Sequence, residues 1–141
     1  MIREGGCLCG AVRFRADAAP GVLACHCGQC QRWTGGGPLL SVQVQDVEII
    51  GEAAIGTYHA STWGERAFCT GCGATLYWRM QDQPIDSLAL GLFDDQSGFT
   101  VVEEIFTDRR PSWLPAWAGA TQSTEAEEMA KLENFRAGDA T

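Results

Sequence analysis

The chain has 141 residues, of which 45% are apolar and 20% charged, a balance typical of one globular domain rather than of a disordered chain. Eighteen acidic against ten basic residues give a formal net charge of −8, which disfavours nucleic acid as a partner. No apolar run reaches the roughly 18 residues of a membrane span, and the N-terminus lacks the apolar stretch of a secretory signal. We therefore expect a soluble, cytoplasmic, single-domain protein without a membrane partner.

Alternation of apolar and polar side chains with a period of two predicts short strands along most of the chain. The clearest of these segments are residues 12–15, 40–49, 76–80, 87–93 and 99–106. Turn signals rich in Gly and Pro separate them, at residues 19–21, 35–38, 51–52 and 64–65. Short strands at this spacing indicate a mainly β domain of antiparallel sheets.

One helix is expected, near the C-terminus at residues 125–136. Thr124 and Glu127 form a capping-box pattern, and acidic residues precede basic ones along the segment, as the helix dipole favours. The expected organisation is therefore a main domain at residues 1–120, followed by a short C-terminal helix and tail at residues 121–141.

The seven cysteines form three clusters, which are Cys7 with Cys9, Cys25 with Cys27 and Cys30, and Cys69 with Cys72. In a reducing compartment such clusters are more often metal ligands or redox groups than disulfides. The two pairs together supply the four thiolates of a closed structural zinc site. The central three suit a zinc ion that keeps one coordination position open for chemistry.

A zinc ion shared by the two pairs would join distant parts of the chain, because Cys9 and Cys69 are 60 residues apart. Such an ion would fasten an N-terminal hairpin to a central hairpin. Closing a loop of this length costs conformational entropy, so we expect metal binding to contribute to folding.

Other interpretations of the cysteines remain open at this point. They include a thioredoxin-like redox pair, disulfides of a secreted protein, and two structural zinc ions without chemistry. His26 lies between Cys25 and Cys27 and could be a fourth ligand, a proton shuttle or a spacer. Adjacent residues in a tight loop seldom bind one ion, which favours a His26 side chain that points away from the metal.

The motifs Gly6-Cys7-x-Cys9-Gly10, Cys25-His26-Cys27-x-x-Cys30 and Arg66-x-Phe68-Cys69-x-x-Cys72-Gly73 occur in this order. Together they resemble the glutathione-dependent formaldehyde-activating enzyme family, also called the centromere protein V-like family. The resemblance covers roughly residues 2 to 117 and includes Trp113-Leu114. It implies a β-tent of antiparallel sheets held together by zinc. It also implies two zinc ions per chain, a structural one on Cys7, Cys9, Cys69 and Cys72 and a catalytic one on Cys25, Cys27 and Cys30.

The resemblance further implies a zinc-dependent carbon–sulfur lyase that acts on thiol–aldehyde adducts. Its substrates would be a small thiol such as glutathione and an aldehyde such as formaldehyde, which combine to S-hydroxymethylglutathione. The chain departs from the family pattern at Glu104, which stands just before Ile105-Phe106, where many relatives carry a histidine. Substrate handling at this position is therefore open.

Glutathione carries two carboxylates, so a cation is expected beside the reactive cluster. Arg32, two residues after Cys30, is the best candidate, and Arg66, Arg109 and Arg110 are weaker ones. Three tryptophans could either wall a substrate pocket or pack in the core, namely Trp33, Trp113 and Trp117.

Two alternatives to catalysis are a zinc-stabilised binding module and a thiol redox or zinc sensor. The fourth ligand of the central cluster discriminates between chemistry and structure. A site that admits an added thiol supports an enzyme, whereas a site closed by His26 supports a structural role.

Overall fold

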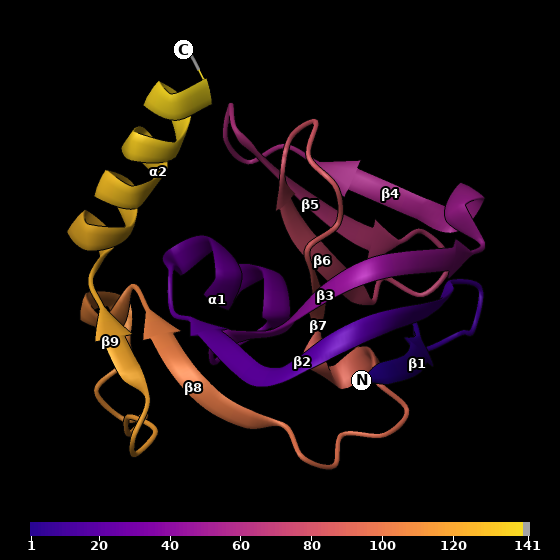
Figure 1. Ribbon diagram of the computed structural model, residues 1–141, viewed down its shortest axis with the longest axis horizontal. Coiled ribbons are helices and arrows are strands. Elements are labelled where there is room, and N and C mark those ends of the chain that lie inside the picture. The colour runs from indigo at the N-terminus through magenta and orange to yellow at the C-terminus, as the bar shows by residue number, and fades with distance from the viewer. Residues whose placement is uncertain (140–141) are drawn as a thin grey trace. The chain divides into compact units, whose positions relative to one another are not determined.

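The computed structural model describes residues 1–139 and is mainly β, with two sheets and a C-terminal helix, as the sequence predicts (Figure 1). Residues 140–141 of the expected tail lie outside the described residues. The strands are β1 (Ile2–Gly6), β2 (Arg13–Cys25), β3 (Leu39–Ile50), β4 (Ile55–Tyr58), β5 (Gly64–Cys69), β6 (Thr75–Met80), β7 (Ser87–Ala89), β8 (Thr100–Ile105) and β9 (Thr121–Ser123). The helices are α1 (Gly28–Thr34) and α2 (Glu125–Asp139).

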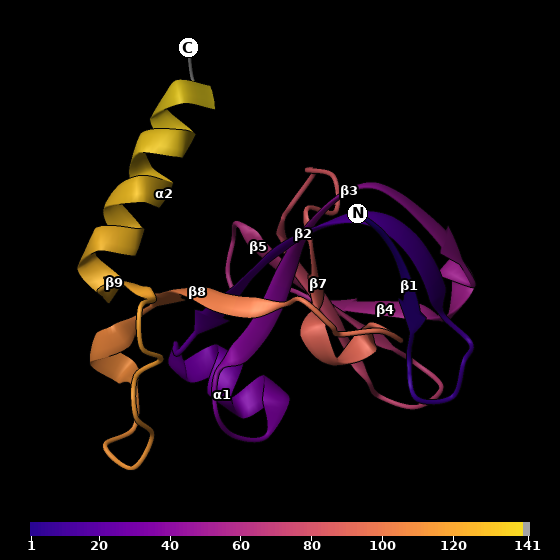
Figure 2. The ribbon, with the colours of Figure 1, turned by 60° about the horizontal axis from the view of Figure 1, so that its bottom comes forward.

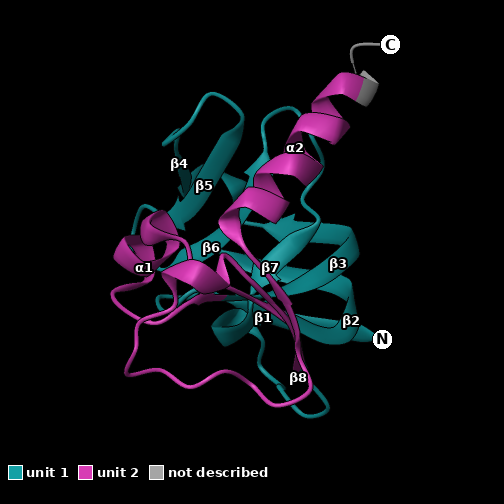
Figure 3. Cartoon of the chain, turned by 90° about the vertical axis from the view of Figure 1, so that its left-hand side faces the viewer, with its two compact units in different colours: residues 1–22, 40–100 teal, residues 23–39, 101–141 magenta. Residues whose placement is uncertain are grey.

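The chain divides into two compact units (Figure 3). Unit 1 contains residues 1–22 and 40–100, and unit 2 contains residues 23–39 and the chain from residue 101 onward. The larger sheet has the strand order β7-β3-β2-β8-β9, and β1 also pairs with β2. The smaller sheet, β4-β5-β6, belongs to unit 1.

Hairpins of antiparallel strands build unit 1. Strand β1 pairs with the start of β2, with Ile2 opposite Asp17 and Gly6 opposite Arg13. Strand β5 pairs with both β4 and β6, and a register shift interrupts its pairing with β6 between Ala67 and Phe68. The Ser87 hydroxyl on β7 donates a hydrogen bond of 3.3 Å to the Trp78 carbonyl on β6, which links the two sheets within this unit.

The core of unit 1 follows the predicted alternation along β2. Phe14, Ala16 and Ala18 are buried, while the residues between them are more exposed. The Phe14 and Phe93 rings meet edge to face with centroids 5.0 Å apart, and Phe93 meets Phe99 in the same way at 5.2 Å. Such pairs add to the stabilisation that burial of the rings provides.

Three sequence expectations in unit 1 are wrong in detail. The turn expected at residues 64–65 is absent, because β5 begins at Gly64. The turn expected at residues 19–21 is absent, because β2 continues through Pro20 to Cys25. Pro20 lies beyond the stretch that pairs with β1, and a strand tolerates proline where no partner needs its N–H. The strand expected at residues 87–93 ends at Ala89 and continues as a short 3₁₀ helix, Leu90–Leu92.

Unit 2 combines short strands with two helices. Strand β8 confirms the strand expected at residues 99–106, but it pairs in parallel with β9, an exception to the antiparallel expectation. Helix α1 was not expected from the sequence; it follows β2 directly and ends at Gly35, whose φ of 87° is the left-handed conformation of a helix C-cap (Figure 2).

Helix α2 begins as the sequence predicts. The backbone N–H of Glu127 donates to the Thr124 hydroxyl at 3.3 Å, and the Thr124 N–H donates to the Glu127 carboxylate at 3.3 Å. This reciprocal pair is the expected capping box. Among residues 1–139, neither helix is long and apolar enough to cross a membrane.

We predict that Gly5→Ala destabilises the fold, because the added Cβ would lie 2.1 Å from the Leu92 carbonyl oxygen. The backbone must shift to relieve such a contact, at a cost of about 1–3 kcal/mol of unfolding free energy. Gly91→Ala is the matched control, because a Cβ there meets nothing within 4 Å. Denaturant unfolding of both variants measures the difference, and equal stability would contradict the predicted close approach of β1 to residue 92.

Candidate metal centres

Four thiols from two hairpin turns lie together in unit 1. Cys7 and Cys9 are in the turn between β1 and β2, Cys69 ends β5, and Cys72 lies in the turn before β6. Their sulfur atoms all lie within 4.8 Å of one another. The Sγ atoms of Cys7 and Cys9 are 3.7 Å apart, and those of Cys9 and Cys69 are 3.8 Å apart.

These distances fit a tetrahedral zinc ion. With a Zn–S bond of about 2.3 Å, two sulfur atoms of a regular tetrahedron are about 3.8 Å apart. The Sγ–Sγ distances of 3.7 and 3.8 Å match this value. Four thiols also form the donor set that zinc favours in closed structural sites, so the residues present fit this metal.

The two turns share one backbone feature. The second cysteine of each pair is followed by a glycine in the left-handed region, Gly10 with a φ of 79° and Gly73 with a φ of 78°. A side chain is strained in this conformation, whereas glycine adopts it freely. The chain thereby bends so that backbone N–H groups face the sulfur atoms, as Val12 does for Cys7 at 3.3 Å.

The thiols of this cluster cannot all ionise side by side without a cation. Burial acts to raise the pKa of Cys7, but the Val12 N–H and the neighbouring thiols outweigh it and lower that pKa to about 6. For Cys9 the Ala11 N–H acts to lower the pKa, yet the Cys7 and Cys69 thiols raise it to about 11. A divalent cation is the partner that would relieve this mutual repulsion.

Three thiols from one short segment lie together in unit 2. Cys25 ends β2, Cys27 precedes α1 as its N-cap, and Cys30 lies in the first turn of α1. Their sulfur atoms lie within 4.8 Å of one another, and the Cys30 N–H donates to Cys27 Sγ at 3.3 Å. The Cys27 and Cys30 thiols, together with burial, raise the pKa of Cys25. This cluster too has the donor chemistry of a zinc site.

Among the described residues, the central cluster has three donor side chains and no fourth His, Cys, Asp or Glu. Cys25 and Cys30 are buried, and Cys27 is partly exposed. The three thiols therefore leave room in a tetrahedral shell for one ligand from outside the chain.

The His26 side chain is hydrogen-bonded to a carboxylate. Its Nε2 lies 2.8 Å from Glu104 Oε1, and both side chains are fully buried. The expectation that His26 points away from the cysteines agrees with this contact. The sequence draws attention to Glu104 as a departure from the family pattern, but nothing in the sequence indicates that its partner is His26.

Glu104 accepts hydrogen bonds from three segments of unit 2. Besides His26, the Trp117 N–H donates to its carboxylate at 2.9 Å and the Gln122 amide at 2.7 Å, and Arg110 Nε lies 3.4 Å away. Burial acts to raise the pKa of Glu104, but the hydrogen bonds from Gln122, His26 and Trp117 and the charge of Arg110 lower it overall. The carboxylate is therefore ionised at neutral pH.

The structure separates the four arginines that the sequence singles out. Arg32 is exposed on the last turn of α1, the helix that carries Cys30. Arg109 binds the Glu125 carboxylate at 2.8 and 3.1 Å, and Arg110 belongs to the buried carboxylate network. Arg66 is almost fully buried in β5 of unit 1. Of these four, Arg32 is the exposed one that lies on the helix of the central cluster.

The three tryptophans have different environments. Trp113 is 71% exposed, and Trp33 on α1 is half-buried. Trp117 is half-buried with its ring centroid 6.4 Å from that of His26. Trp117 therefore contributes to the surroundings of His26, whereas Trp113 does not pack in a core.

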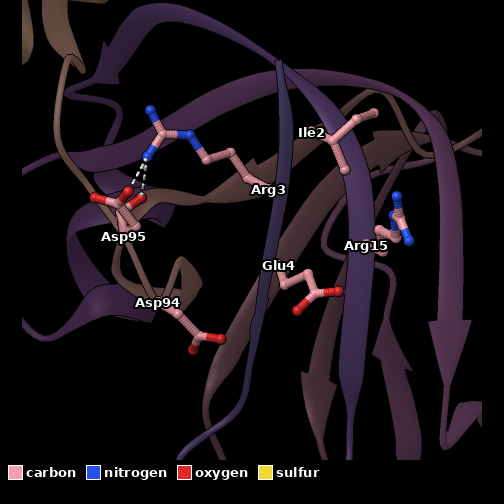
Figure 4. A pocket seen from close by; sticks show the side chains of 6 residues that line it. All are labelled: Ile2, Arg3, Glu4, Arg15, Asp94 and Asp95. Atoms are coloured by element: carbon pink, nitrogen blue, oxygen red, sulfur yellow. Dashed lines mark hydrogen bonds and ion pairs between the residues drawn. The ribbon is translucent and has the colours of Figure 1, made fainter.

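A shallow hollow of about 380 Å³ lies on unit 1 at strand β1 (Figure 4). Arg3 on β1 makes an ion pair of 2.8 Å with Asp95 beside it. The lining residues are Ile2, Arg3, Glu4, Arg15, Asp94 and Asp95. None of them is a cysteine or another predicted site residue, so this hollow is separate from both clusters.

A mainly β chain with one group of four thiols and one group of three defines a cysteine-rich protein with two candidate metal centres. Comparison with known families makes the assignment specific. Residues 2–109 match the model of the family described as glutathione-dependent formaldehyde-activating enzyme. The chain belongs to this family.

Two curated relatives are each 34% identical to the chain. An uncharacterised lyase of Schizosaccharomyces pombe aligns over 76 residues, which is 53% of this chain and 56% of the relative. A Halomonas elongata protein, named as a candidate glutathione-dependent formaldehyde-activating enzyme, aligns over 88 residues, 55% of each chain. The matches thus span little more than half the length of these relatives.

A solved structure supports the fold. The crystal structure of a Rhodobacter sphaeroides protein superposes with a TM-score of 0.52 and 18% sequence identity, covering 86% of this chain and 99% of that one. At this identity the likeness concerns the fold alone.

We predict that loss of one ligand affects the two clusters differently. Structural zinc contributes about 10–16 kcal/mol in small zinc domains, comparable to the roughly 5–15 kcal/mol stability of a whole domain. Cys72→Ser removes a ligand that joins turns 60 residues apart, so we expect a poorly soluble or unfolded chain. Cys27→Ser affects a cluster that closes no long loop, so it retains most of the β circular-dichroism signal. Melting temperatures of the two variants provide the test. If Cys27→Ser unfolds the chain as badly as Cys72→Ser, the central cluster is structural.

Proposed function

We propose that this protein is a zinc-dependent carbon–sulfur lyase that acts on adducts of a small thiol with an aldehyde. Glutathione and formaldehyde are the substrates that the family's description names. In the forming direction a bond joins the thiol sulfur to the carbonyl carbon, and the thiol proton ends on the carbonyl oxygen. In the lyase direction the same carbon–sulfur bond breaks and the proton returns to sulfur.

The observation that carries the proposal is the number of donors in the central cluster. Cys25, Cys27 and Cys30 offer three thiols, and the described residues supply no fourth donor. His26 would be the nearest candidate in the sequence, but its Nε2 is engaged by Glu104 at 2.8 Å. An open three-thiol site is typical of catalytic zinc, whereas the four-thiol cluster is typical of structural zinc.

The residues of the central cluster have distinct roles in this proposal. Cys25, Cys27 and Cys30 hold the metal, and α1 aims the Cys30 N–H at Cys27 Sγ, where it stabilises negative charge on that sulfur. The chemistry that a zinc ion on these thiols would supply is a lowered pKa of a bound substrate thiol and its placement near the aldehyde. The partial exposure of Cys27 gives the substrate a side from which to approach.

Arg32 is the residue that we assign to substrate charge. Its guanidinium is exposed and lies on the same short helix as Cys30. Arg109 is a less suitable partner for an anion, because Glu125 already binds it at 2.8 Å. An arginine recognises a carboxylate through two parallel hydrogen bonds, and glutathione offers two carboxylates.

We predict two zinc ions per chain when the protein is purified under reducing conditions without chelator. The reason is the complete division of the seven cysteines into a group of four and a group of three. Plasma emission spectrometry measures the count, and Cys27→Ser is expected to lower it by one. A count of zero in freshly prepared, reduced and folded protein would contradict both metal sites.

We further predict turnover of glutathione with formaldehyde, and a charge-selective loss in Arg32→Ala. A hydrogen bond to a charged group contributes about 1.5–3 kcal/mol, so the turnover of glutathione falls roughly 10-fold to 100-fold. Mercaptoethanol, which carries no carboxylate, is expected to react at nearly the wild-type rate.

The matched control for Arg32→Ala is Arg109→Ala, which removes an exposed arginine that Glu125 already pairs. We expect Arg109→Ala to leave the turnover of both glutathione and mercaptoethanol unchanged. Equal loss of turnover for both thiols in Arg32→Ala would assign Arg32 to the metal site or to stability. Absence of any thiol–aldehyde turnover in wild-type protein that holds two zinc ions would overturn the lyase proposal and favour a zinc-stabilised binding module.

A further inference from the structure

A fully buried carboxylate lies in unit 2, outside both thiol clusters. Glu104 lies on β8 with no exposed surface. It is not a member of either thiol cluster. A buried charge destabilises the folded state unless it is paired and hydrogen-bonded. The Glu104 carboxylate therefore needs its hydrogen-bond partners.

His26 is attached to β8 and its neighbours through nearly all of its polar groups. Its N–H donates to the Ile105 carbonyl at 3.0 Å, and its own carbonyl accepts from the Gln31 amide at 2.7 Å. Gln31 also donates to the Arg109 carbonyl at 2.9 Å. The His26 backbone is thus hydrogen-bonded to the end of β8 through its N–H and to Gln31 through its carbonyl.

The imidazole ring, by contrast, depends on one side-chain hydrogen bond. An ionised carboxylate only accepts, so His26 Nε2 carries the proton that it shares with Glu104 at 2.8 Å. The other ring nitrogen, Nδ1, is buried and has no hydrogen-bond partner among the described residues. Glu104 is therefore the hydrogen-bond partner that orients this ring.

Glu104 also connects this ring to the segment that follows β8. Its second carboxylate oxygen accepts from the Trp117 N–H and the Gln122 amide, at 2.9 and 2.7 Å. Trp117 in turn lies beside the His26 ring. One carboxylate therefore connects the turn that carries the three thiols to two later segments of the same unit.

We propose that Glu104 is a positioning residue for the central cluster: it binds the His26 imidazole, fixes the residue between Cys25 and Cys27, and thereby holds Cys25, Cys27 and Cys30 as an open three-thiol site. The proposal rests on the proposed function, because it assumes a metal ion on these cysteines. Groups that orient a metal site without contacting the metal change its affinity by about 10-fold to 100-fold when they are replaced.

The test uses Glu104→Gln, which keeps the size of the side chain and removes its charge. The amide can no longer offer two acceptor oxygens, so either His26 or one of the other donors loses its partner. The matched control is Glu103→Gln on the same strand, because Glu103 is only half-buried. We expect Glu104→Gln to lose zinc from the central cluster to a competing chelator about 10-fold more readily than Glu103→Gln and wild type.

Cobalt substitution of the full chain provides a readout other than activity. An open site changes its visible absorption bands when a small thiol such as mercaptoethanol enters it. We expect this change in wild type and in Glu103→Gln, and its loss in Glu104→Gln. Identical chelator competition and thiol response in Glu104→Gln and Glu103→Gln would overturn the proposal.

A double-mutant cycle tests whether Glu104 acts through His26. If it does, His26→Gln has a similar effect on metal retention, and the double variant is little worse than either single variant. Additive losses would overturn this route. If Glu104→Gln fails to fold, as judged by circular dichroism, His26→Gln carries the same chelator and cobalt test, because it removes the ring but leaves the Gln122 and Trp117 bonds to Glu104.

The wild-type chain and Cys27→Ser separate failure of this inference from failure of the proposed function. If the two have the same metal content, the central cluster holds no metal and the proposed function fails. If wild type holds one ion more than Cys27→Ser while Glu104→Gln matches wild type in metal retention and thiol response, only the role of Glu104 fails.

Discussion

Four sulfur atoms at tetrahedral spacing lie where the turn that follows β1 meets the turn that follows β5, and this is the tightest geometric constraint in unit 1. Thiols at 3.7–3.8 Å repel one another once they ionise, as the divergent pKa values of Cys7 and Cys9 reflect. A bound cation would convert that repulsion into attraction and would close a loop of 60 residues. The glycines of both turns serve this end, because they bend the backbone around the sulfur atoms.

Unit 2 is organised around a polar centre. Its buried side chains include His26, Glu104 and Ser123 beside the small or sulfur-bearing Ala24, Cys25 and Cys30. A buried carboxylate is tolerated only when its lone pairs are satisfied, and Glu104 meets that condition through His26, Trp117 and Gln122. Such a network specifies one arrangement of the segments that it joins, which suits a region that has to hold three thiols in a fixed geometry.

Thiol ligands can therefore form both a closed and an open metal site in one chain. Four thiols complete a tetrahedral shell and leave no position for chemistry, whereas three thiols leave one. At the central cluster the one histidine between the thiols is hydrogen-bonded to Glu104. The chain belongs to a family described as glutathione-dependent formaldehyde-activating enzyme, and its Glu104 hydrogen-bonds the residue between Cys25 and Cys27.

Much of the secondary structure and the grouping of the thiols could be predicted from the sequence, because the signals that determine them are local. Period-two alternation located β3, β6 and β8, and the Thr124–Glu127 pattern located the start of α2. Cysteine spacing divided the thiols into a group of four and a group of three, and the structure brings the same groups together. A ligand pair within a few residues is limited by the backbone itself, so its spacing carries geometric information.

Tertiary structure decided the features that depend on partners distant in the chain. The continuation of β2 through Pro20 depends on which strands lie beside it, and the parallel pairing of β8 with β9 depends on where the chain returns after residue 120. Helix α1 is too short for a periodic pattern to reveal it. The contact between His26 and Glu104 joins residues 78 apart, and no local pattern predicts such a pair. By itself the sequence determined which atoms could bind metal; only the folded chain decided that the histidine among them binds a carboxylate instead, because that choice depends on burial and on a partner from another strand.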